Sequence, residues 1–165
     1  MNSDGDSAAL PPEEAAQRTL KRALLSAIGA ILDQQIAQLS EKISSAREAA
    51  KQEEKSSAGD KYETTRAMMH LEEEMFTRQR ATIAEQRAAL VKIDESPCEE
   101  ITLGALTATS RGLIFFSLGL GTVEIDGRAY LCLSPEAPIS RALWEAEEGD
   151  TVDFRGELIE IFELC

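Results

Sequence analysis

The stretch Asp94-Glu95-Ser96-Pro97-Cys98 divides the chain into two regions of different composition. Before it, residues 13–92 contain no proline, and their only glycines are Gly29 and Gly59. From Ser96 onward, the chain carries three prolines, seven glycines and most of its aromatic side chains. Because proline and glycine interrupt helices and mark turns, the sequence predicts a helical first region and a second region of short strands.

The first region has the apolar spacing of a coiled coil. One stripe recurs at steps of three and four through Leu25, Ile28, Leu32, Ile36, Leu39, Ile43, Ala46 and Ala50. A second stripe runs through Met68, Leu71 and Met75 and then drifts to Phe76, Ile83, Leu90 and Ile93. Small residues and Gly59 interrupt the pattern between them. We therefore expect helices over 13–55 and 61–93 that form an antiparallel hairpin with its tip at 56–63.

The second region alternates like strands. Residues 101–109 have a period of two, and 113–118 form an apolar run. Two pairs of segments, 122–125 with 129–133 and 151–154 with 158–162, flank the turn sequences Asp126-Gly127 and Arg155-Gly156. Residues 138–146 can form one helix that buries the apolar run. The sequence thus predicts the α+β class, with a helical hairpin followed by a small antiparallel sheet that holds one helix.

Charge and cysteine content limit the function classes. The 165 residues carry 30 acidic and 17 basic side chains, a net charge of -13, which excludes a basic nucleic-acid-binding domain and independent DNA binding. Residues 96–165 hold 13 acidic and 4 basic side chains, which suits docking onto a basic surface. Three cysteines without a Cys-x-x-Cys pair favour a reducing compartment. Residues 1–12 are expected to be a disordered acidic tail, and without a long apolar stretch the protein is expected to be cytoplasmic, with no membrane partner.

Two motifs carry a resemblance to a known family. Gly59-Asp60-Lys61-Tyr62-Glu63, at the expected turn, places a carboxylate three positions after Asp60. Ser134-Pro135-Glu136-Ala137-Pro138-Ile139-Ser140-Arg141-Ala142-Leu143 is followed by Gly149-Asp150-Thr151-Val152. Over residues 15–165 the chain resembles the Gre transcript-cleavage factors of bacterial RNA polymerase, which pair a coiled-coil hairpin with an FKBP-like domain. The resemblance implies a hairpin domain at 13–95 and an FKBP-like, polymerase-docking domain at 96–165.

The resemblance also implies roles for particular residues. Asp60 and Glu63 would share a magnesium ion with RNA polymerase and assist its active site, so the chain would be an activator and not an enzyme, with no tightly bound cofactor. The nascent RNA 3′ end would contact Lys55, Lys61, Tyr62 and Arg66. The polymerase would be docked by Pro138, Ile139, Ser140, Arg141, Leu143 and Trp144.

The residues alone leave other interpretations open. An Asp followed three positions later by a Glu is also a variant of the helix capping box, and basic residues on a coiled coil often only solvate it. Leu143 and Trp144 suit either the core of the small domain or a docking patch. Thr64, Thr65 and Arg66 replace the asparagine and Glu-Tyr pair usual in the family, which leaves open a channel regulator without cleavage. A coiled-coil adaptor unrelated to transcription is a further alternative, whereas few aromatics disfavour a prolyl isomerase.

Overall fold

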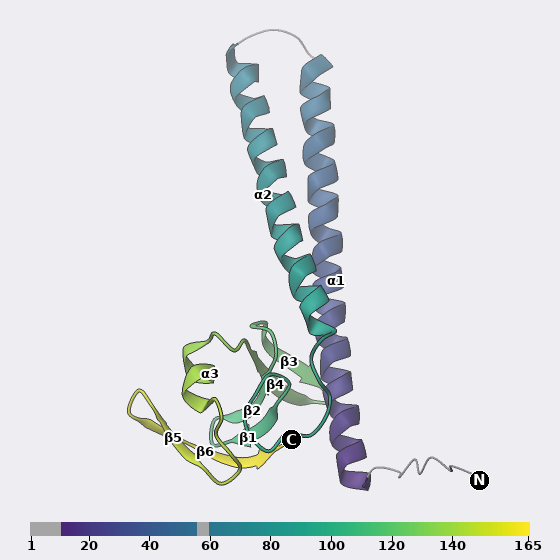
Figure 1. Cartoon of the computed structure of the whole chain (residues 1–165). Coiled ribbons are helices and arrows are strands. Elements are labelled where there is room, and N and C mark those ends of the chain that lie inside the picture. The colour runs from purple at the N-terminus through teal and green to yellow at the C-terminus, as the bar shows by residue number, and fades with distance from the viewer. Residues whose placement is uncertain (1–10, 56–59) are drawn as a thin grey trace, which may run out of the picture. The chain divides into compact units, whose positions relative to one another are not determined.

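The computed structural model describes residues 11–55 and 60–165, with the side chains of 11–52 and 63–165 (Figure 1). The elements are α1 (Pro12–Lys55), α2 (Asp60–Leu90), β1 (Leu106–Thr109), β2 (Gly112–Phe116), β3 (Gly121–Ile125), β4 (Arg128–Leu133), α3 (Pro138–Leu143), β5 (Thr151–Phe154) and β6 (Glu157–Leu164). This composition confirms the α+β class. Of the expected disordered tail, residues 1–10 lie outside the described residues, and Pro12 already begins α1.

The chain forms two compact units that divide within α1. One unit comprises residues 28–92, and the other joins residues 93–165 to the part of the chain up to Ala27. The sequence-based interpretation had grouped residues 13–95 as one hairpin. In the structure the first turns of α1 instead belong with the sheet, and these units are described separately below.

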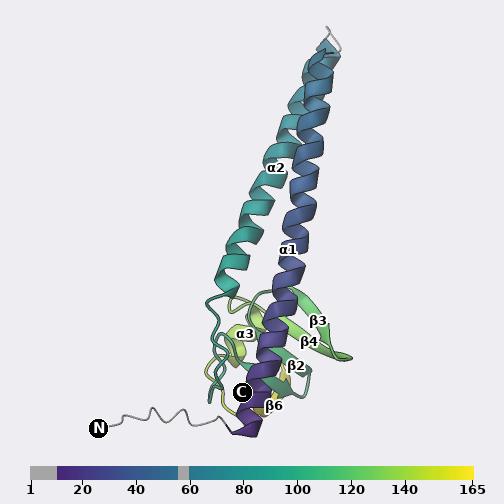
Figure 2. The ribbon, with the colours of Figure 1, turned by 90° about the vertical axis from the view of Figure 1, so that its right-hand side faces the viewer.

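In the helical unit, α1 and α2 lie side by side and antiparallel (Figures 1 and 2). Their bounds agree with the predicted helices to within about three residues. The buried face of α1 contains Ile28, Leu32, Leu39, Ile43 and Ala50, which confirms most of the first apolar stripe. Burying this narrow stripe against the second helix is what stabilises such a pair, since isolated helices gain little from propensity alone.

The predicted contact stripe of α2 is wrong in its first part, at residues 68, 71 and 75, and correct from Phe76 onward. Met68, Leu71 and Met75 are 60%, 65% and 48% exposed. The face turned toward α1 contains Met69 together with the predicted Phe76, Ile83 and Leu90, which recur every seven residues and are half-buried or buried. Lys42 of α1 lies 5.4 Å from the centre of the Phe76 ring. The error arose because neighbouring apolar residues occupy both 68 and 69, and both 75 and 76, so composition alone does not determine the phase.

The six strands form one mixed sheet in the order β3-β4-β2-β1-β6-β5. Both predicted tight hairpins are present, with Asp126-Gly127 joining β3 to β4 and Arg155-Gly156 joining β5 to β6, all four residues at positive φ. The prediction of a purely antiparallel sheet is wrong at one pair, because β2 and β4 run parallel from Leu113↔Tyr130 to Phe116↔Leu133. An apolar run such as 113–118 has the same pattern in either direction, and therefore the sequence carried no signal for this pairing.

Two elements are shorter than predicted, and their ends pair with each other. The strand expected over 101–109 begins only at Leu106, because Gly104 turns the chain with a φ of 95°. A Cβ at position 104 would lie 2.7 Å from the Asp94 carbonyl oxygen, so glycine is required there. The helix expected over 138–146 ends at Leu143, since Glu145 turns to a φ of 63°. Ile101 then donates its N–H to the Ala146 carbonyl at 2.8 Å, and Glu145 donates to Ile101 at 3.0 Å.

The core lies between the sheet and α3. Ile114 and Phe116 of β2 pack with Leu143, Ile159 and Ile161, all at most 1% exposed. The expectation that the apolar run is buried against the helix is therefore confirmed. The opposite face of the sheet is also buried, at Phe115, Tyr130 and Cys132 among others.

Polar contacts attach the segment after α2 to the first turns of α1. Lys21 is 1% exposed and donates from Nζ to the Ser96 carbonyl at 2.8 Å, and its pKa is lowered, mainly by burial. Arg18 donates to the Ser96 hydroxyl at 3.3 Å, and Arg22 pairs with Glu95 at 2.7 Å.

No helix among the described residues is long and apolar enough to cross a membrane.

Cys132 should make stability depend on pH in the alkaline range. Burial raises the pKa of this fully buried thiol from 9.0 to about 11. Between these values the unfolded chain has lost a proton that the folded chain retains, so its stabilising contribution is present below pH 9 and is lost as pH rises toward 11. Replacing Cys132 with alanine should remove this loss in the free energy of unfolding, which is on the order of 2 kcal/mol across that pH range.

The measurement compares urea unfolding of the parent chain and Cys132→Ala at pH 8, 9 and 10.5. The variant serves as the reference because Lys21 is present in both proteins. The lowered pKa of Lys21 changes stability with pH in the opposite direction, and this contribution cancels in the comparison. Equal slopes for the two proteins would show that the thiol does not titrate in this range.

Candidate functional site

The candidate residues of the predicted tip fall at the ends of the two helices. Lys55 is the last residue of α1, and Asp60 is the first residue of α2, so Lys61, Tyr62 and Glu63 lie in its first turn. The side chains of Lys55, Asp60, Lys61 and Tyr62 lie outside the described residues. Glu63 and Arg66 are exposed on α2.

Two carboxylates three positions apart in a helix project from the same face. Asp60 and Glu63 have this spacing, and the helix N-terminus favours negative charge there. Together they offer fewer oxygens than the six that Mg²⁺ requires, so these residues fit an ion only where another molecule completes its shell. Among the residues that the structure describes, no group of three or more His, Cys, Asp or Glu side chains is placed to hold a metal ion.

A ladder of polar contacts between α1 and α2 fixes how the helices are paired. Arg87 donates to Asp33 at 2.9 Å, Arg80 to the Ser40 hydroxyl at 3.4 Å, and Arg47 to Glu73 at 2.6 Å. We call these three pairs the polar ladder. Each step of seven residues up α1 is matched by a step of seven down α2, so one uninterrupted register runs through this unit. A Cβ on Gly29 would lie 3.3 Å from the Arg87 guanidinium carbon, so the missing side chain leaves room for that arginine.

Sequence reasoning missed the polar ladder although its signal is visible. Positions 33, 40 and 47 and positions 73, 80 and 87 each repeat every seven residues, in phase with the apolar stripes. A search for apolar spacing passes over such positions because they are polar. Pairing the two polar series would also have given the correct phase of α2.

The predicted docking residues separate into buried and exposed sets. Ser140 and Leu143 are 0% exposed, so the prediction that they contact a partner is wrong. Leu143 faces the core because α3 packs against β2 and β6, and Ser140 precedes it by nearly one turn. Pro138 and Arg141 are exposed, Ile139 packs partly against the core, and Trp144 is half-buried. Only these four can offer surface to another molecule.

Ser140→Ala should leave the free energy of unfolding unchanged or raise it by about 1 kcal/mol. The hydroxyl oxygen of Ser140 is buried and has no hydrogen-bond partner in the described part of the chain, and an unsatisfied buried hydroxyl costs stability. Thermal and urea unfolding of the full chain measure the effect. Ser140→Thr is the control, since it keeps the hydroxyl and adds a methyl group to a closed core, and it should be destabilising. A loss above about 1 kcal/mol in the alanine variant would contradict the expectation.

Comparisons with known proteins give weak likenesses. No family model matches the chain, and no curated protein sequence matches it. Among solved structures, the "GreA factor homolog 1 (Gfh1) protein of Thermus thermophilus" is similar at 17% identity and a TM-score of 0.30, covering 83% of this chain and 94% of that one. A structure titled "the transcription factor Gfh1" is similar at 17% identity and a TM-score of 0.30, covering 82% of this chain and 90% of that one.

Proposed function

We propose that this chain is a transcription elongation factor that enters the secondary channel of bacterial RNA polymerase and stimulates the polymerase's own cleavage of backtracked RNA. The observation that carries the proposal is the position of the acidic pair, in the first turn of α2 immediately after the interruption between the helices. The resemblance of Gly59-Asp60-Lys61-Tyr62-Glu63 and of residues 134–152 to the Gre factors supports the same function.

In this proposal the chain's residues position groups and the polymerase performs the chemistry. Asp60 and Glu63 would add carboxylates to a magnesium ion that the polymerase and the RNA phosphate also bind, and such an ion polarises the scissile phosphate. A free carboxylate oxygen of the pair would orient the attacking water. Lys55, Lys61, Tyr62 and Arg66 would contact the RNA 3′ end by phosphate contacts and stacking. The acidic side chains of residues 96–165 would face a basic rim of the polymerase. Pro138, Arg141 and Trp144 would contact the polymerase beside that rim.

A cleavage assay on a backtracked elongation complex tests the proposal. Purified polymerase, stalled on a template with a misincorporated RNA 3′ end, is incubated with Mg²⁺ with and without the full chain. Faster release of short 3′ fragments is expected when the chain is present. Co-sedimentation of the chain with the polymerase reports binding in the same samples, and the chain alone with free RNA should release nothing.

A second candidate is a channel regulator that does not stimulate cleavage. The substitution of Thr64, Thr65 and Arg66 for the residues usual after the acidic pair favours it. The same assay separates the two, because the regulator would bind the polymerase and leave cleavage unchanged or slower. An adaptor unrelated to transcription would not bind the polymerase at all.

A further inference from the structure

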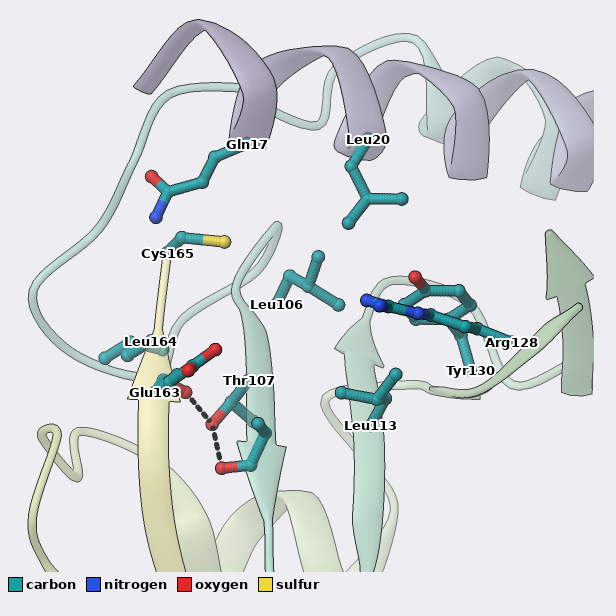
Figure 3. A pocket seen from close by; sticks show the side chains of 11 residues that line it. Gln17, Leu20, Leu106, Thr107, Leu113, Arg128, Tyr130, Glu163, Leu164 and Cys165 are labelled. Atoms are coloured by element: carbon teal, nitrogen blue, oxygen red, sulfur yellow. Dashed lines mark hydrogen bonds between the residues drawn. The ribbon is translucent and has the colours of Figure 1, made fainter. Parts of the chain in front are cut away.

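The buried face of the sheet opposite α3 contains a cavity of about 140 Å³. Gln17 and Leu20 of α1 line one side of it, and the other side is formed by residues of β1, β2, β4 and β6 (Figure 3). Its walls are apolar at Leu20, Leu106 and Leu113. An apolar cavity of about 150 Å³ is known to accept benzene, so this one has room for a ligand of roughly six to nine non-hydrogen atoms.

Three polar groups at the cavity have no partner within the described residues. The Tyr130 side chain is 2% exposed, and its hydroxyl makes no hydrogen bond there. Arg128, from the same strand, forms no ion pair in the described chain, nor does the Gln17 amide form a hydrogen bond. Figure 3 shows the guanidinium end of Arg128 and the Tyr130 hydroxyl pointing into the space beneath Leu20. Unlike the hydroxyls of Ser117 and Ser140, which are fully enclosed without a partner, the Tyr130 hydroxyl opens onto the cavity, where a ligand can accept its hydrogen bond.

Two further polar residues of the cavity already have hydrogen-bond partners. Thr107 donates its hydroxyl to the Glu163 carbonyl at 2.6 Å. Cys165 exchanges backbone hydrogen bonds of 2.9 Å with Leu106. The donors left for a ligand are therefore Arg128 and Tyr130 on β4 and the Gln17 amide on α1.

Charge at the two ends of the cavity selects the ligand class. Arg128 lies on β4 and Glu163 on β6, with β2 and β1 between them. Three strand spacings separate these ends by about 14 Å, which is too far for a ligand of this volume to reach both. A ligand with one negative charge, bound at Arg128, would therefore lie far from the Glu163 carboxylate. A longer ligand with a second negative charge would bring that charge toward Glu163, which would repel it.

We propose that this cavity binds a small monocarboxylate with an apolar body, whose carboxylate accepts hydrogen bonds from Arg128 and Tyr130 while its body contacts Leu20, Leu106 and Leu113. Guanidinium pairs well with carboxylate in bidentate geometry. Arg128 is exposed, so its end of the cavity is the entrance and the apolar body enters first. The site does not depend on the function proposed above.

Benzoate is the probe, titrated into the full chain and followed by ligand-detected NMR and by the amide signals of Leu106, Leu113 and Tyr130. We expect saturable binding with a dissociation constant in the millimolar range or below. Benzyl alcohol, which keeps the ring without the charge, should bind more weakly, and benzylamine more weakly still. Failure of benzoate to bind up to about 20 mM, or equal binding of all three probes, overturns the proposal.

Two variants test the named donors. Arg128→Gln should weaken benzoate binding about tenfold or more, the cost of a charged hydrogen bond, and leave benzyl alcohol binding unchanged. Tyr130→Phe keeps the buried ring and should weaken benzoate severalfold. Arg155→Gln, on the β5–β6 turn, is the matched control and should bind like the parent chain. Unfolding curves confirm that each variant is folded, and unchanged benzoate affinity in folded Arg128→Gln overturns the assignment.

Discussion

Asp60→Asn is expected to abolish stimulated cleavage of backtracked RNA, with a loss of about a hundredfold or more, and to leave polymerase binding nearly unchanged. Asparagine is about as good as aspartate at a helix N-terminus, so α2 should still begin at the same place. The substitution removes the negative charge that would hold the shared magnesium ion, and metal stabilisation of the transition state amounts to several kcal/mol. The assay is single-turnover cleavage by a backtracked complex saturated with the variant.

The controls distinguish an ion-binding carboxylate from a helix cap. Glu63→Gln should show a loss in the same direction. Glu72→Gln, at another exposed carboxylate of α2, should cleave like the parent chain. Calorimetry of the free chain should detect no tight magnesium binding, since two carboxylates leave most of the shell unfilled. If Asp60→Asn supports cleavage at the parent rate, Asp60 serves only as a cap.

Leu143→Ala is expected to lower the free energy of unfolding by about 2–5 kcal/mol. Leu143 is 0% exposed and packs among Ile114, Phe116, Ile159 and Ile161, and truncating such a side chain loses its burial and leaves a cavity. Because domains are typically stable by only 5–15 kcal/mol, this loss should be large enough to shift the unfolding midpoint clearly. Urea unfolding followed by the fluorescence of Trp144, the only tryptophan, reports the change directly.

Arg141→Ala is the matched control for the same helix. Arg141 is exposed, so its removal should change stability by less than about 0.5 kcal/mol, while in the proposed function it should weaken polymerase binding. A Leu143→Ala variant as stable as the parent would mean that α3 is not held by this core.

The helices and hairpins of this chain could be predicted because each has a local cause. The absence of proline between residues 13 and 92 and the apolar steps of three and four predict long helices, and Asp126-Gly127 provides the positive φ that a tight turn requires. The parallel pairing of β2 with β4 has no such local cause. It depends on where the chain goes after Phe116, and the alternation of apolar residues is the same for both directions.

The candidate sites differ in the same way. Asp60 and Glu63 are three positions apart in the sequence, so the prediction that they act together needs only the spacing of a helix. Ser140 and Leu143 were assigned to a surface because a motif does not say which side of a short helix meets the core. The cavity at Tyr130 could not be foreseen at all, since Gln17 and Leu20 come from a helix more than a hundred residues earlier in the chain.

The order of charges along the polar ladder gives the hairpin a defined length. If α2 slid by one heptad in one direction, Arg47 would face Arg80, and in the other direction it would face Arg66. Either slip would set two guanidinium groups against each other and would also add or remove seven residues at the turn. The apolar stripes distinguish these registers less sharply, because apolar side chains recur every seven residues in both helices. Charge order thus selects one register of α1 and α2 over the registers shifted by a heptad.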